Sequence, residues 1–477
     1  MELSSGDFSD SVTPAEDRSL WGSLRLAIAG TEQDFTRGPI SRAVFLLAVP
    51  MVLEMVMESI FAVCDVFFVS RLGAEAVATV GLTESLLTLV FGLAIGFSMA
   101  TTALVARRIG EKRPDRAGVV AGQALLVALA ASVVLGGVGV MTAPSVLRLL
   151  GASDGVLQGG ADYARVLLGG SGTIVFLFLI NAVFRGAGDA AIAMRVLWLA
   201  NLINIVLDPC LIFGLGPFPE LGVTGAAVAT TIGRGVGVLY QLKVLLGGRG
   251  RVHVRLSDLG LDREVMTGLL RVSVGGVLQV LAATASWVGL MRVMALFGDT
   301  ALAGYTIAIR IIIFSILPAW GLANAAATLV GQNLGAGRLD RAERSVWLTS
   351  LYNMIFLGAV GLLFLFLAEV LVGLFSTDPA ILEIGAECLR ILSYGYLFYA
   401  LGMVMEQAFN GAGDTMTPTY INFVCYWLCQ IPLAWYLAVS LGLGPRGVFW
   451  AIMVSETLLA VVGVAFFRRG RWRQRQV

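Results

Sequence analysis

Long apolar runs recur along almost the whole chain and restrict its fold more than any other feature. Reading the runs between Gly, Pro and charge breaks gives about twelve, each close to the roughly 20 residues that a helix needs to cross a bilayer core. They fall near residues 43–70, 77–106, 117–142, 161–184, 191–214, 222–246, 266–297, 301–331, 345–374, 384–409, 416–441 and 447–467. Such runs lack the strict alternation of membrane barrel strands. The sequence therefore predicts an all-α membrane protein.

The composition supports a membrane protein and excludes several other classes. Hydrophobic residue types make up 57% of the 477 residues and charged types only 14%, whereas a soluble domain carries about 25% charged residues. A formal net charge of +1 lacks the basic excess of a nucleic-acid binder. Five cysteines and one histidine leave little for a disulfide framework or a metal centre. We expect no cofactor, no nucleic-acid partner, no enzymatic activity and no obligatory protein partner.

Basic residues mark one side of the predicted membrane protein. They follow the second, sixth and eighth runs and fill the C-terminus, as Arg107, Arg108, Lys112, Arg113 and Arg116; Lys243, Arg249, Arg251, Arg255 and Arg263; Arg338, Arg341 and Arg344; and Arg468, Arg469, Arg471, Arg473 and Arg475. The positive-inside rule places these loops and both termini in the cytoplasm. The first 40 residues lack the apolar core of a signal peptide. We therefore expect a multi-pass membrane protein with both termini in the cytoplasm.

The two halves of the chain match at an offset of 225 residues. The segment FRGAGD at 184–189 recurs as FNGAGD at 409–414, RPDRA at 113–117 recurs as RLDRA at 338–342, and Gly110 falls on Gly335. Several matches at one offset indicate duplication of a six-span unit. An even number of spans gives both copies the same orientation, so an axis along the membrane normal should relate them, as in parallel-repeat transporters.

The repeat sets the predicted domain boundaries. We expect two six-helix lobes related by pseudo-twofold symmetry, with a cavity between them and alternating access by rocking. The predicted parts are a cytoplasmic N-terminal segment (1–40), an N-lobe (41–246), a cytoplasmic linker (247–264), a C-lobe (265–467) and a basic cytoplasmic tail (468–477).

Ionisable side chains inside the predicted spans point to an ion-driven machine. The sequence contains no GxxxxGK[ST] phosphate loop, so an ion gradient is the natural drive. A carboxylate at membrane depth costs about 2.5–3.5 kcal/mol on insertion scales. These groups gather in the first half, as Glu54, Glu58 and Asp65 in the first span, Glu84 in the second, and Asn201, Asn204 and Asp208 in the fifth.

The spacing of these groups predicts an ion site in the first half. Asn204 and Asp208 share one helix face, and Pro209 frees a backbone carbonyl one turn earlier. With Asp65 they form an oxygen-ligand site for Na⁺, although the same carboxylates can instead carry a proton. At offset 225, Asp65 and Asp208 become Leu290 and Leu433. The second half therefore lacks these acids.

The remaining polar groups receive a second role. Glu54 falls on Gln279 at offset 225, and Glu406, which corresponds to Asn181, is the one comparable acid of the second half. We interpret these residues as groups for substrate binding or a second protonation step: Glu54, Glu58, Glu84, Gln279 and Glu406. The alternative for Glu54 and Glu84 is a neutral, helix-bonded carboxyl near a span end.

At these residues the chain resembles the multidrug and toxic compound extrusion (MATE) transporters. The resemblance rests on Pro50, on DVFFVSRLG at 65–73, FRGAGD at 184–189 and its second copy, NLINIVLDP at 201–209, and GVTGAAVAT at 222–230. It implies about twelve helices in a V-shaped, two-lobed fold. It also implies efflux of cationic or amphipathic compounds in exchange for H⁺ or Na⁺.

The prokaryotic branch with a cation site in the N-lobe fits best, and this resemblance implies a protein of the bacterial inner (plasma) membrane. The site residues of that branch carry over to this chain by resemblance. They fall on Asp65, Asn204, Asp208, Asn181 and Thr230, with Thr224 as the alternative to Thr230. Glu54 and Glu58 are extra to that pattern.

Three functions are considered for this sequence. The first is a secondary antiporter whose partners are a small cationic or amphipathic solute and membrane lipid. The second is a flippase for a lipid-linked precursor, but a pyrophosphate substrate calls for a cationic cavity and the predicted one is acid-rich. The third is a membrane receptor or scaffold that moves no solute.

Overall fold

The computed structural model describes residues 20–30, 33–248 and 250–475, and every regular element in these ranges is helical. Residues 1–19 of the predicted N-terminal segment and 476–477 of the predicted tail lie outside the described residues. The first half contains α1 (Leu20–Ala29), α2 (Ile40–Ser70), α3 (Ala74–Gly110), α4 (Pro114–Leu149), α5 (Asp154–Gly169), α6 (Ser171–Ala187), α7 (Ala190–Phe213) and α8 (Val223–Leu246).

The second half repeats this order after a short 3₁₀ turn (Leu256–Leu259). It contains α9 (Arg263–Met294), α10 (Asp299–Gly335), α11 (Leu339–Gly373), α12 (Pro379–Ser393), α13 (Tyr396–Gly411), α14 (Met416–Asn422), α15 (Ile431–Trp435) and α16 (Pro445–Arg468). Short 3₁₀ turns follow α9 (Ala295–Phe297) and α16 (Arg471–Gln474), and π-helical turns (Phe423–Gln430 and Tyr436–Ser440) join α14 and α15 into one rod.

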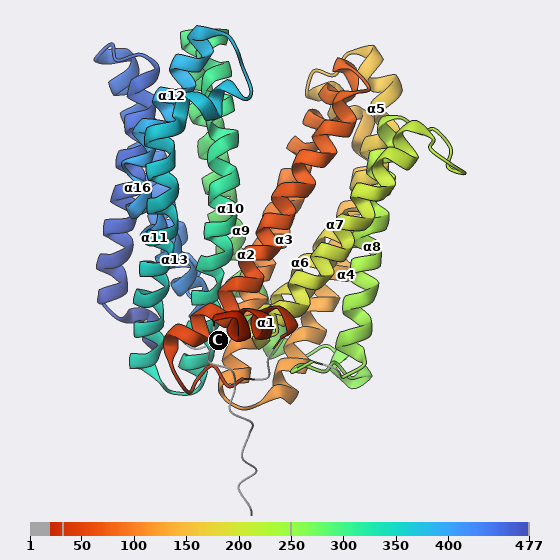
Figure 1. Ribbon diagram of the computed structural model, residues 1–477. Coiled ribbons are helices and arrows are strands. Elements are labelled where there is room, and N and C mark those ends of the chain that lie inside the picture. Colours follow the sequence, from red (N-terminus) through yellow and green to blue (C-terminus); the bar gives the residue numbers. More distant parts are fainter. Residues whose placement is uncertain (1–19, 31–32, 249, 476–477) are drawn as a thin grey trace, which may run out of the picture.

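Two bundles form a V (Figure 1), which confirms the predicted all-α, two-lobed fold. Helices α2–α8 make the N-lobe and α9–α16 the C-lobe. The predicted offset holds closely, because α3 begins and ends 225 residues before α10. The ribbons converge at the face where α1 and the C-terminal end lie, here called the terminal face, and diverge toward the opposite, open face.

The helices are long and apolar enough for an integral membrane protein. Within the described residues, ten helices qualify as spans, and the pair α12 and α13, bent by 60°, makes an eleventh. Helix α8 has the length of a span, with 24 residues, but carries Arg234 and Lys243. With it, each lobe has six rods, as the sequence predicts.

Four long helices join the lobes in a symmetric way. Helix α2 packs on α10 and, by the same pseudo-twofold relation, α3 packs on α9. Near the terminal face α3 also crosses α10, with Gly110 against the carbonyl of Gln332 and Gly335 against the carbonyl of Arg107. A Cβ at either glycine would lie 2.0 or 2.1 Å from that carbonyl oxygen. The glycine repeat noted in the sequence therefore permits a close backbone contact between lobes.

A short segment before α2, here called the interlobe strap (residues 33–39), ties the lobes together at the terminal face. On the N-lobe side, Asp34 pairs with Lys112 at 2.7 Å, and Arg251 donates to the Gln33 carbonyl at 2.6 Å while lying over the ring of Phe35. On the C-lobe side, Arg341 donates to the carbonyls of residues 35, 37 and 38 at 2.7–3.3 Å. The strap therefore stabilises the closed terminal face.

Candidate transport site

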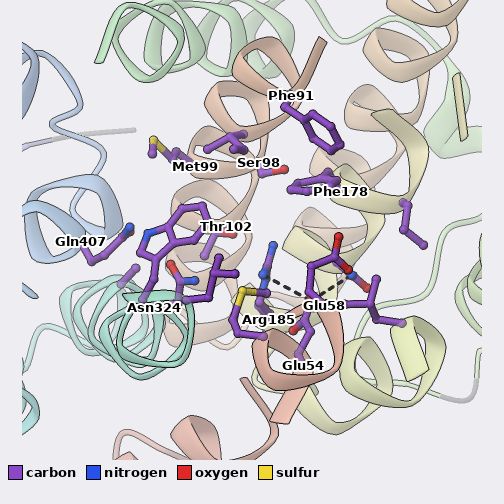
Figure 2. A pocket seen from close by; sticks show the side chains of 18 of the residues that line it. Glu54, Glu58, Phe91, Ser98, Met99, Thr102, Phe178, Arg185, Asn324 and Gln407 are labelled. Atoms are coloured by element: carbon purple, nitrogen blue, oxygen red, sulfur yellow. Dashed lines mark hydrogen bonds and ion pairs between the residues drawn. The ribbon is translucent and has the colours of Figure 1, made fainter. Parts of the chain in front are cut away.

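A cavity of about 230 Å³ lies between the lobes (Figure 2), and α2, α3, α6, α7 and α8 face α10 and α13 across it. Many of its lining residues form pairs at the repeat offset of 225, which means that the pseudo-twofold axis passes through it. These pairs are Ile95 and Trp320, Met99 and Asn324, Thr102 and Ala327, and Arg185 and Asn410. Figure 2 shows Asn324 and Gln407 on the side opposite Glu54 and Glu58.

The charge of this cavity differs from the prediction. Within the described residues, its charged lining side chains are Glu54, Glu58, Arg185 and Arg234, all from the N-lobe. Two carboxylates face two guanidinium groups, so the formal charges cancel. The expectation of an acid-rich cavity is therefore wrong, because it counted the carboxylates of the spans and not the arginines on α6 and α8.

Glu54 is the centre of a buried hydrogen-bond network beside the cavity. Its side chain is 2% exposed, pairs with Arg185 at 3.5 Å and accepts from Asn181 Nδ2 at 3.1 Å. Gln241 donates in turn to Asn181 Oδ1 at 2.5 Å. Asn181 therefore belongs with Glu54 and does not contact Asp208 or Asn204 through any hydrogen bond of the described residues.

Glu58 lies one turn further along α2 and meets a second cation. Asn201 Nδ2 donates to its Oε2 at 3.1 Å, and Arg234 of α8 interacts electrostatically with both Glu58 and Asp65. The guanidinium of Arg234 lies 5.8 Å from the ring centroid of Phe61 and 5.7 Å from that of Phe91. Such cation–π contacts help to hold the half-buried Arg234 in place. Arg234 therefore connects the cavity to the part of the N-lobe that lies nearer the open face, here called its upper part.

The predicted ion site lies in that upper part, nearer the open face. Asp208 is fully buried, and Asn204 Nδ2 lies 3.3 Å from its Oδ1 and donates to Thr230 Oγ1 at 2.9 Å. Of the two candidate threonines, Thr230 is therefore the one that contacts Asn204. In the described part of the chain, Asp208 Oδ2 and Asn204 Oδ1 have no hydrogen-bond donor. Half-buried Asp65 interacts electrostatically with Asp208 from α2. This donor set fits a proton or a Na⁺ ion.

Other predicted site residues lie outside both groups. Glu84 is exposed on α3 and interacts electrostatically with Arg310 of α10. Gln279 is buried on α9, and its Oε1 has no partner among the described residues. Glu406 interacts with Glu456 of α16 inside the C-lobe. The expectation that Glu406 is the one comparable acid of the second half is wrong, because Glu456 also lies within a span.

Sequence reasoning missed four residues of these sites: Arg185, Arg234, Asn410 and Glu456. For Arg185 and Asn410 the signal was present, since they are the one difference between FRGAGD and FNGAGD. Arg234 stands between two glycines in a span. This pattern suggests close helix packing and does not indicate the carboxylates that Arg234 meets.

Comparisons with known proteins match the sequence and the fold over most of this chain. The sequence model of the MatE family matches residues 50–210 and 277–436. A protein of Thermotoga maritima named "Probable multidrug resistance protein NorM" is 28% identical over 92% of this chain and 94% of its own length. A Shewanella oneidensis protein named "FAD transporter" is 27% identical over 89% and 93%. A solved structure described as the outward-facing conformation of a MATE family transporter superposes with a TM-score of 0.87 at 28% identity, over 92% of this chain and 98% of that one.

Proposed function

Because this chain belongs to the MatE family of membrane transporters, we propose that it is a secondary antiporter that exports amphipathic compounds, cations among them, in exchange for H⁺ or Na⁺. One observation carries the proposal. A cavity lined by both lobes shares Arg234 with the aspartate site, in which Asp208 Oδ2 and Asn204 Oδ1 have no donor among the described residues. The Thermotoga relative is named for multidrug resistance and the Shewanella relative for transport of FAD, which supports an organic solute as cargo.

The orientation follows from the basic loops. The predicted cytoplasmic residues Arg107, Lys112, Arg338 and Arg475 all belong to the terminal face of the structure. The positive-inside rule then places this face in the cytoplasm and the open face outside the cell. The described conformation is accordingly the outward-facing one, in keeping with the state named for the solved relative.

The geometry suggests how ion and cargo compete. Arg234 is the shared counter-ion of Asp65 and Glu58. When Asp65 and Asp208 are ionised and empty, Asp65 holds Arg234, and Glu58 is available to a basic group of the cargo. When a proton or Na⁺ neutralises Asp65 and Asp208, the attraction between Arg234 and Asp65 falls, and Arg234 pairs more strongly with Glu58. Binding of the ion therefore takes the counter-ion Glu58 away from the cargo and lowers the affinity for the cargo. Antiport requires that ion and cargo weaken each other's binding in this way.

The test is transport by the purified protein in proteoliposomes, with a pH gradient and a Na⁺ gradient imposed separately and ethidium as the cargo. Asp65→Asn and Asp208→Asn should abolish gradient-driven movement. Because asparagine mimics the neutralised aspartate, Asp65→Asn should also weaken ethidium binding about 5- to 150-fold, although neither side chain lines the cavity. Asp162→Asn is the matched control, since this exposed acid of the same lobe pairs only with Arg165 in the described structure. Full activity of both aspartate variants would refute the proposed coupling site.

The same experiment separates the two rival functions. A flippase for a pyrophosphate-bearing lipid needs a net cationic cavity, and the balanced cavity of this chain does not supply one. A receptor or scaffold would show no solute flux under either gradient. Ethidium movement driven by one ion and not the other would also identify the coupling ion.

A further inference from the structure

We propose that the last described residues of the chain form a latch between the two lobes, and that the terminal face opens only when this latch releases. The segment, here called the C-terminal latch (residues 471–475), follows α16 and includes a 3₁₀ turn. The latch controls the motion of the lobes whatever cargo or coupling ion the protein uses, so it is a feature beyond the proposed antiport reaction.

A buried tryptophan fixes the latch to the C-lobe. Trp472 is 1% exposed, and its ring stacks on that of Phe467 in α16 with the centroids 4.7 Å apart and the planes 7° apart. Its indole Nε1 donates to the carbonyl of Phe467 at 2.9 Å, which satisfies the polar atom that a buried tryptophan must pair. Gly470, with a φ of +73°, permits the reversal of the chain between the two rings. The segment therefore has a defined place on the C-lobe.

Two ion pairs hold the arginines that follow Trp472. Arg473 pairs with Glu343 of α11, and Arg475 pairs with Asp414 Oδ1 at 2.9 Å. The Asp414 side chain is 3% exposed, and its other oxygen accepts from Thr417 at 2.7 Å. A buried carboxylate is costly to leave without its cation. Asp414 therefore keeps the end of the latch in place.

One contact of the latch crosses to the N-lobe. Arg107, in the last turn of α3, donates to the backbone carbonyl of Arg475. Within the described residues, the other hydrogen bonds and ion pairs of the latch stay in the C-lobe. A cavity of about 810 Å³ lined by both lobes adjoins Arg107 and Arg475, so the lobes do not pack tightly at this point. When α3 moves away from the C-lobe, the bond from Arg107 must break. The latch therefore stabilises the closed terminal face.

The repeat provides the N-lobe with a matching anchor. Asp189, the last residue of the FRGAGD segment, corresponds to Asp414 at offset 225. It pairs with Arg251 at 3.3 Å and accepts from the backbone N–H of the same residue at 2.9 Å. Arg251 follows α8 as Arg475 follows α16, and it holds the interlobe strap through the Gln33 carbonyl. In both copies of the repeat, the aspartate thus anchors an arginine that takes part in a connection between the lobes.

The rate at which a buried cysteine is alkylated measures the opening of the terminal face. Thr328 of α10 is 0% exposed, and its hydroxyl donates to the Arg185 carbonyl of α6 at 3.0 Å, so the N-lobe covers it until the lobes separate. In a Thr328→Cys protein without cargo or gradient, the rate of reaction with a water-soluble maleimide follows the population that is open at this face. Cys388, buried inside the C-lobe, stays as the reference for unfolding, and the other four native cysteines are replaced.

Two variants on opposite lobes should speed this reaction. Arg475→Ala removes the pair that holds the latch to Asp414, and Arg107→Gln removes the donor from α3. Each should raise the alkylation rate at position 328 about three- to tenfold, the size of effect expected for the loss of one hydrogen bond. Because both changes break the same contact, the double variant should raise the rate no further than the stronger single variant.

Arg471→Ala is the matched control. Arg471 is an exposed arginine of the same segment, and its side chain has no partner in the described part of the chain. Its replacement removes the same charge and should leave the alkylation rate unchanged. An equal increase in this control, or a parallel increase at Cys388, would assign the effect to lost charge or to unfolding and overturn the latch.

The outcomes also separate the latch from the proposed function, because alkylation requires no transport. Unchanged alkylation in both Arg475→Ala and Arg107→Gln, with ethidium driven by a gradient, would overturn the latch and leave the antiporter intact. Faster alkylation in both variants, without gradient-driven movement of ethidium in the wild-type protein, would support the latch and overturn the antiporter.

Discussion

Replacing Gly110 or Gly335 by alanine should open the terminal face. A Cβ at Gly110 would lie 2.0 Å from the carbonyl oxygen of Gln332, and one at Gly335 would lie 2.1 Å from that of Arg107. Both obstacles are backbone atoms, so α3 and α10 must move apart. Overpacking of this kind costs roughly 1–3 kcal/mol. Because the crossing requires the lobes to meet at this face, the cost falls on the state with a closed terminal face and shifts the population about 5- to 150-fold.

Spin labels on the terminal face measure this shift. Asp115 and Asp340 begin equivalent helices of the two lobes and are both exposed, so cysteines at these positions, after replacement of the five native cysteines, report the separation of the lobes. Each glycine variant should add a population with a longer distance.

A glycine-to-alanine change elsewhere in the N-lobe controls for the gain in helix propensity that each variant also brings. Gly137 lies within α4, and a Cβ at this position would have no neighbouring atom within 4 Å. Alanine there should stabilise the helix by about 0.5–1 kcal/mol without moving the labels. Unchanged distance distributions in both Gly110→Ala and Gly335→Ala would refute the assignment of this crossing to one state.

Three further predictions concern the strap and the ion site. Arg341→Ala removes the hydrogen bonds that Arg341 donates to the strap and leaves the one from Arg338 to the Thr36 carbonyl. It should raise hydrogen exchange of the strap about tenfold at unchanged transport-site affinity. Partial burial acts to raise the pKa of Asp34, but hydrogen bonds from Lys112 and Thr36 outweigh it and hold the pKa at about 2, below the usual 3.8. The stabilisation by ionised Asp34 is thus complete above about pH 4 and lost only as the pH falls toward 2, so strap exchange corrected for intrinsic rate should match at pH 7 and 5. Thr230→Val should slow gradient-driven export about tenfold by removing the acceptor for Asn204, whereas Thr224→Val should leave the export rate within twofold.

The sequence was sufficient for the fold because membrane insertion imposes length and apolarity on every span. The run predicted at 77–106 became α3 at Ala74–Gly110, and the offset of 225 located its counterpart α10. Contacts within one helix were also accessible, since Asn204 and Asp208 lie one turn apart and do meet. Both kinds of information depend on spacing along the chain, which a helix converts directly into position.

Contacts between helices were harder to predict. Asn181 carries over by resemblance to the ion site with Asp208, but in the structure it donates to Glu54 of α2, 127 residues earlier in the chain. Arg234 reaches Glu58 and Asp65 from α8. Such pairs depend on the rotation and depth at which two helices pack, and neither quantity is written in the hydrophobic pattern of one helix.

The unequal distribution of charge between the halves follows from the symmetry of the scaffold. Because the pseudo-twofold axis passes through the cavity, a residue kept in both copies faces its own counterpart across that cavity. Arginine at both 185 and 410 would set two guanidinium groups against each other, and like charges in a poorly solvated space repel strongly. Asparagine at 410 avoids that repulsion and keeps hydrogen-bonding capacity. A duplicated transporter with a charged cavity must therefore diverge first at its axis, and differences between the two copies are the place to look for cargo contacts.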